Sequence, residues 1–308
     1  MDQFGIKVGL HKKDAFEGWF TKVDDLNSGL MFSVIWGYTT HEETKHAFIQ
    51  FQDNLNHGTT YLRYPIEAFS WEENPFKLKI GKNMLTKEAM QLDLMLGDKP
   101  VRGEFTFSAL STIRSSLLRP NIMGILTFLP NECNHAIISM HHKVNGRLQM
   151  GEKTWVIEEA QGYMEKDWGT GFPQEYVWLQ VNDWPDSSVV FSYATVPMLG
   201  KYAKGFFAVV LHKGCEYRFS SIEGSKLTDF HVTKDAFKAT IVKKDFLLHL
   251  DAKQFNPVAL ASPIQGEMKA HIKESLDGTM ELKLEKKGER IIQLSSLRAS
   301  IDVHFNDN

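Results

Sequence analysis

The sequence predicts an all-β chain made of two barrel-like units, and three observations support this. Apolar and polar residues alternate with a period of two in many segments, as in strands that bury one face. Gly, Asn, Asp and Pro residues separate these short segments, and helical periodicity is weak throughout. The chain has 308 residues, which is more than one small barrel requires, so two units are expected.

Two hairpins are the clearest elements. Met90–Leu96 alternates apolar and polar residues, a GDKP turn follows, and Val101–Phe107 places its two phenylalanines on one face. Met280–Leu284 alternates in the same way before the turn Lys286-Lys287-Gly288. In Ala299–Phe305 the apolar residues alternate with Ser300, Asp302 and His304. Further strands are predicted at Phe32–Tyr38, Ala47–Gln52, His135–His142, Tyr176–Asn182, Val189–Thr195, Phe206–His212, Glu216–Phe219 and Phe246–Leu250.

Charge and composition exclude several classes of function. The 35 basic and 38 acidic residues give a net charge of −3 and are spread along the chain. No Lys/Arg block marks a nucleic-acid site, so no nucleic-acid partner is expected. No apolar run approaches the roughly 18 residues that a membrane-spanning helix needs.

The cysteines and the first residues predict a location. Cys133 and Cys215 are the two cysteines, too few for a disulfide framework, which fits a reducing compartment. The first residues, MDQFGIKVGLHKKDAF, lack the basic-then-apolar pattern of a secretory signal. A cytoplasmic protein is therefore expected.

Familiar catalytic and cofactor motifs are missing from the sequence. It contains no G-x-G-x-x-G, P-loop, G-x-S-x-G or C-x-x-C pattern, so no nucleotide cofactor is expected. Aromatic residues make up 12% of the chain, with 21 Phe and 7 Trp. Most of these rings are expected to build β cores, although aromatic side chains also line sites for apolar ligands.

The segment Glu132–His142 raises the question of a metal site, because it contains a Glu, a Cys and three His. On a regular strand, His135 and His141 share a face but lie about 20 Å apart. That separation is too large for two ligands of one ion. Hydrogen-bonded histidines, or a polar line facing a cavity, are the preferred interpretation, and no metal is predicted.

The segment Gly162–Pro173, GYMEKDWGTGFP, contains three consecutive charges between aromatic residues. On a strand, Glu165 and Asp167 share one face, and Lys166 and Trp168 share the other. Two carboxylates about 7 Å apart could divide acid and base roles if an apolar wall raised the pKa of one. The alternative is a solvated hairpin face, which composition alone favours.

Three segments resemble a known family. F-E-G-W-F at 16–20 is similar to a family signature near the start of the chain. L-P-N-E-C-N-H at 129–135, followed by I-S-M at 138–140, is similar to its P-x-E-C-x-H…S-M segment. G-Y-M-E-K-D-W-G at 162–169, with F-P at 172–173 and W-L-Q-V-N at 178–182, is similar to its most specific block. These segments, in this order, resemble the tocopherol cyclase family.

The resemblance implies a fold and a reaction. The fold would be two lipocalin-like antiparallel β-barrels packed together, spanning residues 1–172 and 173–308, with Trp19 closing one end of the first barrel. The segment 162–169 would be the closing strand of that barrel, with two inward carboxylates. Tocopherol cyclases protonate a prenyl double bond of a hydroquinone, and the phenol oxygen then closes a chromanol ring. The reaction changes no oxidation state, so the resemblance implies no cofactor.

The same resemblance suggests site residues. Glu165 and Asp167 are the candidate acids, since a neutral carboxylic acid in an apolar pocket can protonate an alkene. Plant members often have Asn at the position of Asp167, which leaves open which carboxyl is the acid. The candidate substrate-binding residues are Trp168, Trp178, His135, Tyr163, Asn182 and Phe172. Trp168 and Trp178 would face the carbocation, and His135 would orient a carboxylate or the phenol.

A second hypothesis is a non-catalytic carrier of an isoprenoid or another lipid, because such barrels serve both purposes. Two buried carboxylates favour chemistry, since a simple lipid carrier gains nothing from them. In either case the expected partner is a hydrophobic small molecule such as a prenyl quinol. Peripheral membrane contact stays open, and the sequence does not determine an oligomeric state.

Overall fold

The computed structural model describes residues 3–117, 119–128, 131–198 and 201–305. Within these ranges the chain is built from antiparallel strands, and its helical elements are three short 3₁₀ helices: η1 (Ile66–Ala68), η2 (Gly124–Phe128) and η3 (Ser221–Glu223). This confirms the predicted all-β class. No helix in the described ranges is long and apolar enough to cross a membrane.

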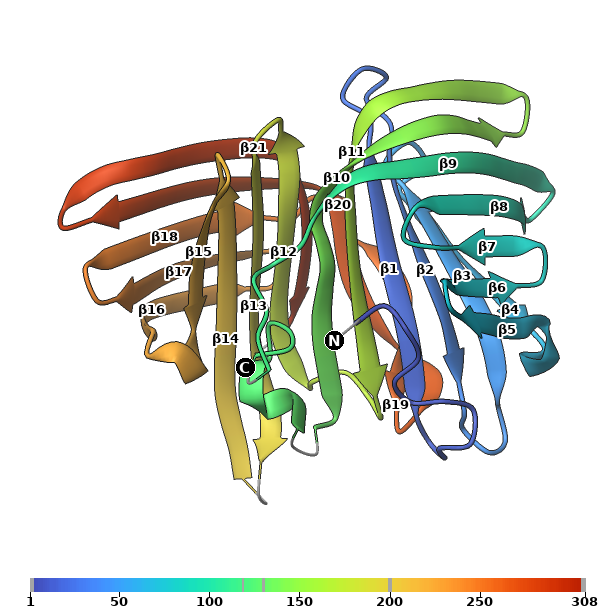
Figure 1. The fold of residues 1–308 in the computed structure, drawn as a ribbon, viewed down its shortest axis with the longest axis horizontal. Coiled ribbons are helices and arrows are strands. Elements are labelled where there is room, and N and C mark those ends of the chain that lie inside the picture. Colours follow the sequence, from blue (N-terminus) through green and yellow to red (C-terminus); the bar gives the residue numbers. More distant parts are fainter. Residues whose placement is uncertain (1–2, 118, 129–130, 199–200, 306–308) are drawn as a thin grey trace. The chain divides into compact units, whose positions relative to one another are not determined.

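The first compact unit contains an 11-stranded antiparallel sheet with the order β4-β3-β2-β1-β11-β10-β9-β8-β7-β6-β5 (Figure 1). The first strand of the chain, β1, thus pairs with the last strand of this sheet, β11, and both lie in its interior. The strands are β1 (Phe16–Asp24), β2 (Met31–Thr39), β3 (His46–Asp53), β4 (Gly58–Tyr64), β5 (Phe69–Glu73), β6 (Phe76–Ile80), β7 (Asn83–Leu85), β8 (Ala89–Leu96), β9 (Lys99–Ser111), β10 (Cys133–Met150) and β11 (Lys153–Gly169).

The second unit repeats this arrangement in its own 10-stranded sheet. Its order is β15-β14-β13-β12-β21-β20-β18-β17-β16, and β19 pairs with β20. Again the first strand, β12, lies beside the last, β21. The strands are β12 (Glu175–Trp184), β13 (Ser187–Met198), β14 (Lys201–His212), β15 (Cys215–Ser220), β16 (Lys226–Thr233), β17 (Ala236–Lys243), β18 (Phe246–Lys253), β19 (Val258–Ile264), β20 (Glu267–Lys286) and β21 (Glu289–His304).

The main division between the units lies between Phe172 and Pro173, with two short exceptions. Asn131 and Glu132 belong to the second unit, and Ala261–Ala270 belongs to the first. The side chain of Gln50 on β3 accepts from the backbone N–H of Ala261 and donates to its carbonyl, both at 2.9 Å. The predicted domains, 1–172 and 173–308, do not contain this exchange, because alternation within strands carries no information on such long-range pairings.

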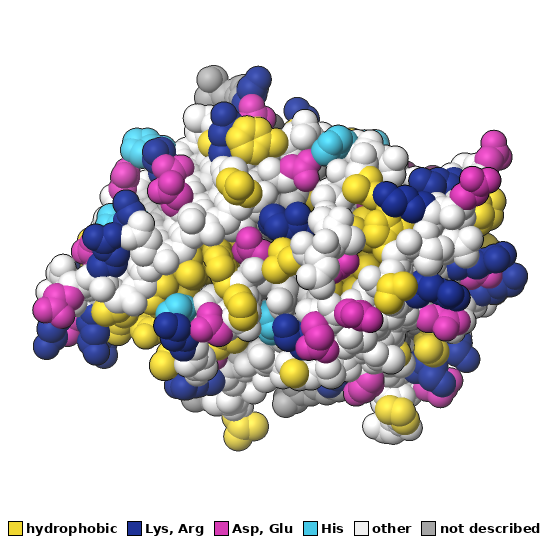
Figure 2. Space-filling model, turned by 90° about the horizontal axis from the view of Figure 1, so that it is seen from above, with side chains coloured by type: hydrophobic (Ala, Val, Ile, Leu, Met, Phe, Trp, Pro, Cys, Tyr) yellow, Lys and Arg dark blue, Asp and Glu magenta, His cyan; other side chains and the backbone are white. Residues whose placement is uncertain are grey.

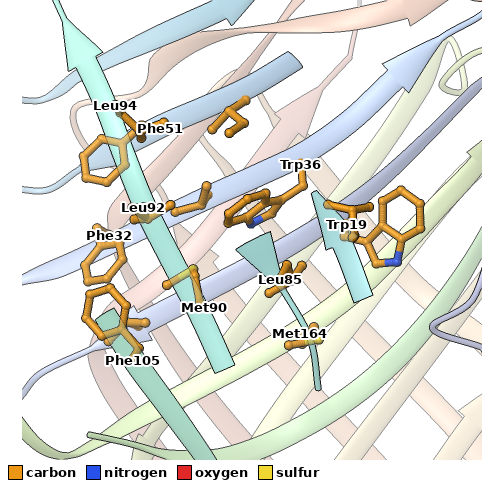
Figure 3. Packing of buried hydrophobic residues seen from close by; sticks show 14 of the residues in the cluster. Trp19, Phe32, Trp36, Phe51, Leu85, Met90, Leu92, Leu94, Phe105 and Met164 are labelled. Carbon is orange, nitrogen blue, oxygen red and sulfur yellow. The ribbon is translucent and has the colours of Figure 1, made fainter. Parts of the chain in front are cut away.

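Buried apolar side chains from the strands of the first unit form one hydrophobic core. Figure 3 shows Trp19, Trp36, Leu85 and Met164 close together within this core. The indole N–H of Trp19 donates to the carbonyl of Phe4 at 2.7 Å, and neither residue is exposed. The N-terminal segment therefore packs against the ring that was predicted to close this barrel.

Charges of both signs are mixed over the face of the molecule in Figure 2. Lys and Arg side chains lie beside Asp and Glu side chains, and no broad area of one sign is visible there. The thiols of Cys133 and Cys215 are not joined in a disulfide bond.

Candidate functional site

Strand β11 presents opposite charges on its two faces. Its register with β1 places Lys166 opposite Trp19 and Met164 opposite Thr21. Met164 and Trp19 belong to the core of the first unit, so Lys166 points toward this core. Glu165 and Asp167 lie on the other face, and the predicted inward orientation of the two carboxylates is wrong. The strand pairs with β1, the first strand of the unit, as expected for the strand that closes the first barrel.

The reason for this orientation is the pairing of Lys166 inside the unit. Its ammonium forms an ion pair with Glu17, and neither side chain is exposed. It also donates to the carbonyl of Gly5, and lies 4.4 Å from the ring centroid of Trp19. A buried ammonium needs such partners, and β1 with the N-terminal segment supplies them. Orienting the strand the other way would place two carboxylates against the indole of Trp19.

Four side chains on the other face form a hydrogen-bonded cluster, hereafter the acid cluster: His135, Tyr163, Glu165 and Asp167. The Nδ1 atom of His135 lies 2.9 Å from Asp167 Oδ1, and its Nε2 atom lies 3.5 Å from Glu165 Oε2. The phenol of Tyr163 donates to Glu165 Oε2 at 2.5 Å. The β10–β11 register, which pairs His135 with Asp167, brings these groups together.

The acid cluster is buried, but not evenly. The side chain of Glu165 is 7% exposed and that of His135 is 12% exposed, whereas that of Asp167 is 21% exposed. Tyr163 is fully buried. Asp167 is therefore the carboxylate that a small molecule can reach most easily, and Glu165 is held behind it by His135 and Tyr163.

The imidazole of His135 carries a proton at neutral pH. Burial opposes its charge, but the negative charges of Glu165 and Asp167 outweigh burial and raise the pKa of His135 to about 9. Burial and the nearby Glu165 raise the pKa of Tyr163 well above its usual value, so this phenol stays neutral. The acid cluster thus consists of an imidazolium between two carboxylates, with a phenol as a fixed donor.

Such a cluster can give up a proton and take one back. His135 and Asp167 share one proton at the more exposed end of the acid cluster. Glu165 stabilises the charged imidazole from the other side of the ring. One donor atom from each of His135, Glu165 and Asp167 lies within 4.8 Å of the others, a spacing that also suits a cation. Since both ring nitrogens of His135 face carboxylates, the protonated form fits this geometry better, and the absence of a metal stays a prediction.

The other candidate residues are distributed differently. The ring of Trp168 shares the inward face with Lys166, whose ammonium lies 5.6 Å from its centroid, so it does not face the carboxylates. Phe172 packs edge-to-face against Phe16, with centroids 5.4 Å apart. Trp178 and Asn182 lie on β12 in the second unit, and both are buried.

Two neighbours of the acid cluster were not predicted. The thiol of Cys133 lies 3.9 Å from Asp167 Oδ1, and the ring of Phe20 lies 6.3 Å from that of Tyr163. Both residues stood in the recognised segments, as F-E-G-W-F and P-x-E-C-x-H, but nothing in one segment shows which other segment it pairs with. The strand register supplies that information: Phe20 lies opposite Glu165.

His142, a third histidine of β10, lies in the interior of the first unit. β-bulges between Ile137 and His142 interrupt the regular alternation. His142 lies in the interior against Phe107, with ring centroids 4.9 Å apart, and burial lowers its pKa to about 3. His142 is therefore a neutral core residue and takes no part in the acid cluster.

Solved structures share this fold at low sequence identity. A crystal structure of CghA with Sch210972 has a TM-score of 0.57 and 9% identity, over 96% of this chain and 89% of that chain. Kievitone hydratase from Nectria haematococca has a TM-score of 0.55 and 10% identity, over 94% of this chain and 88% of that chain. At these identities the similarity concerns the lipocalin-like fold alone. No curated protein matches this chain.

The sequence itself gives a more specific result. Residues 110–304 match the family described as tocopherol cyclase-like. This range is more than half of the chain, and it includes all four residues of the acid cluster. The chain belongs to the tocopherol cyclase-like family.

Proposed function

We propose that the protein is an enzyme that cyclises a prenylated hydroquinone to a chromanol by acid–base catalysis. The observation that carries this proposal is the acid cluster, in which an imidazolium is buried between two carboxylates. Buried ionisable groups with shifted pKa values are typical of functional sites. Membership of the tocopherol cyclase-like family supports the choice of reaction.

The reaction begins with transfer of a proton from the His135–Asp167 pair to the prenyl double bond. The π electrons form the new C–H bond, and a tertiary carbocation develops at the more substituted carbon. A lone pair of the phenol oxygen then forms the C–O bond, and the phenol proton returns to the pair. Substrate and product are isomers, so the reaction consumes no oxidant, reductant or water.

The neighbouring residues have separate roles in this scheme. Asp167 is the member of the proton-sharing His135–Asp167 pair that meets the substrate, because it is the most exposed residue of the acid cluster. Glu165 is a positioning residue that keeps His135 protonated and accepts the phenol proton of Tyr163 in a hydrogen bond. Once its proton has moved to the alkene, the cluster holds two carboxylates and a neutral imidazole, and this negative charge stabilises the carbocation. The ring of Phe20 provides an aromatic face beside it.

The test is incubation with 2-geranyl-1,4-hydroquinone and longer prenyl homologues, followed by chromatography and mass spectrometry. Because the chromanol has the same mass as the substrate, the expected result is a new retention time at unchanged mass. Asp167→Asn should reduce turnover on the order of 100-fold or more, since general acid–base groups contribute 10²–10⁴-fold. Glu165→Gln should shift the alkaline limb of the pH–rate profile to lower pH, because His135 loses one of its two anionic neighbours.

The competing function is a carrier of the same kind of molecule. A carrier would bind the hydroquinone and release it unchanged, and neither variant would alter the retention time of the recovered ligand. Unchanged substrate across all chain lengths, together with stoichiometric binding, would overturn the enzymatic proposal. Trp155→Phe is a matched control on the same strand, since Trp155 lies outside the acid cluster.

A further inference from the structure

A second set of buried polar side chains lies in the second unit, on the face of β12 and β21 that points away from that unit's core. Val177, Leu179 and Ile301 belong to the core. The residues that alternate with them therefore lie on the opposite face. These residues are Tyr176, Trp178, Gln180, Ser300 and Asp302, hereafter the β12–β21 polar face, and the register pairs Trp178 with Asp302 and Gln180 with Ser300.

Several of these polar atoms have no hydrogen-bond partner in the described part of the chain. They are both amide atoms of Gln180, the hydroxyl of Ser300 and Oδ1 of Asp302. Gln180 and Ser300 are fully buried, and Asp302 is 3% exposed. A buried polar group without a partner costs about 1–3 kcal/mol, so folding alone does not explain three such residues side by side.

Asp302 is the chemically distinctive member of this set. Its Oδ2 accepts a hydrogen bond from the phenol of Tyr176 at 2.5 Å. Burial raises the pKa of Asp302 to about 8, although the bond from Tyr176 opposes this shift. The carboxyl group is therefore protonated at neutral pH, and because Oδ2 is engaged as an acceptor, Oδ1 is the atom available to donate.

The surroundings define what such a site can hold. The side chains on this face include no Lys or Arg, and Glu274 on β20 is a buried cross-strand neighbour of Asp302. An anion is thus disfavoured. His304, half-buried, has a pKa that burial lowers, and its ring lies 5.5 Å from that of Tyr176. Together with Trp178, these rings offer apolar contact beside the three polar groups.

We propose that the β12–β21 polar face is a binding site for the carbonyl or hydroxyl oxygen of an uncharged hydrophobic molecule. Asp302 donates a hydrogen bond to that oxygen, and Gln180 and Ser300 supply the neighbouring donors and acceptors. This site is separate from the acid cluster in its residues, and the proposal does not depend on turnover. A molecule can occupy it whether or not the protein is a cyclase.

The test uses geranylacetone, an apolar chain ending in a ketone, and the hydrocarbon in which a methylene group replaces the carbonyl. Calorimetric titration should show tighter binding of the ketone. Gln180→Leu should weaken ketone binding about fivefold to tenfold, the value of one or two neutral hydrogen bonds. The same change should not lower thermal stability, since it removes polar atoms that have no partner. Infrared difference spectra should show a shift of the Asp302 carboxylic-acid band on binding, and Asp302→Asn should abolish that band.

Gln161→Leu is the matched control. Gln161 on β11 is also buried and has an amide oxygen without a partner, but it lies in the first unit. Its replacement should leave ketone binding unchanged. Equal affinity for ketone and hydrocarbon, an unaltered affinity in Gln180→Leu, or an Asp302 band that does not respond to ketone would each overturn the proposal. Ordered water at the β12–β21 polar face in a crystal grown with excess ketone would do the same. Loss of turnover in the Asp167→Asn variant, by contrast, bears only on the cyclase.

Discussion

Lys166 and Glu17 form a fully buried ion pair, which is an unusual feature of a β core. Glu17 also accepts hydrogen bonds from the backbone of Lys7 at 2.7 Å and of Val8 at 3.0 Å, and from the phenol of Tyr38 at 2.5 Å. These donors satisfy the carboxylate, and they also fix the N-terminal segment to the first unit. The ion pair therefore connects the segment 162–169 on β11 to the N-terminal residues Lys7 and Val8.

We expect Lys166→Met to destabilise the protein by about 3–5 kcal/mol, because it leaves a buried carboxylate without its counter-ion. The double variant Glu17→Gln, Lys166→Met should recover part of this loss, since neither charge then remains. Urea-induced unfolding measures both free energies. Lys238→Met, which removes a partner of Asp251 in an exposed pair, is the control and should change little. Equal effects of the two lysine changes would contradict the assigned role of Lys166.

The charge of His135 predicts a pH-dependent stability. Its pKa is about 9 in the folded protein and 6.5 in the unfolded chain, so the folded state holds the proton more tightly. This contribution, on the order of 3 kcal/mol, is complete below about pH 6.5 and is lost as the pH rises to about 9. The difference in unfolding free energy between the wild type and His135→Gln should therefore shrink from pH 6.5 to pH 9.5. A constant difference over this range would show that His135 is neutral.

The pairing of β10 with β11 depends on a close contact between a glycine and a histidine. A Cβ atom added to Gly162 would lie 2.2 Å from Nε2 of His142. The histidine ring cannot move aside easily, because it is held by Ser139 at 3.1 Å and packs on Phe107. Gly162, the first residue of the segment 162–169, therefore allows β11 to pack closely against His142 of β10.

Gly162→Ala should cost about 1–3 kcal/mol, the usual range for overpacking in a core. In a His142→Ala background the same substitution should cost much less, because the ring is gone. A double-mutant cycle from thermal or urea unfolding gives this coupling. Gly58→Ala on β4 is a matched control, since the added Cβ would make only an ordinary contact with the carbonyl of Asn56 at 3.7 Å. An uncoupled cycle would show that Gly162 is needed for another reason.

At the scale of the whole molecule, Gln50 connects residues 211 positions apart in the sequence. Its side-chain amide pairs with both backbone groups of Ala261, in the segment that joins the first unit. Gln50→Ala should raise amide hydrogen exchange of residues 258–270 and destabilise the protein by about 1–3 kcal/mol, because two partly buried backbone groups of Ala261 lose their partners. Gln52→Ala, which removes only a 3.5 Å contact with Ser33, should have a smaller effect. Equal exchange rates in both variants would contradict this role of Gln50.

The sequence by itself determined the all-β class, most of the strand positions and the family. These properties are local: alternation with period two identifies a strand, and the block at 162–169 is specific over eight residues. The resemblance to the family also predicted Tyr163, Glu165, Asp167 and His135 as site residues. The structure adds that these four side chains contact one another through hydrogen bonds and ion pairs.

Only the tertiary structure decided which face of β11 points inward. A period of two separates Glu165 and Asp167 from Lys166, but it does not say which set is buried against the core, because both faces of this strand are buried. The orientation follows from the partners of Lys166 inside the unit, which are Glu17, Trp19 and the N-terminal segment. The same holds for Asp302: the alternation of Ala299–Phe305 placed it on the polar face, and burial of that face raised its pKa. Burial arises from contacts between distant strands, which no single segment contains.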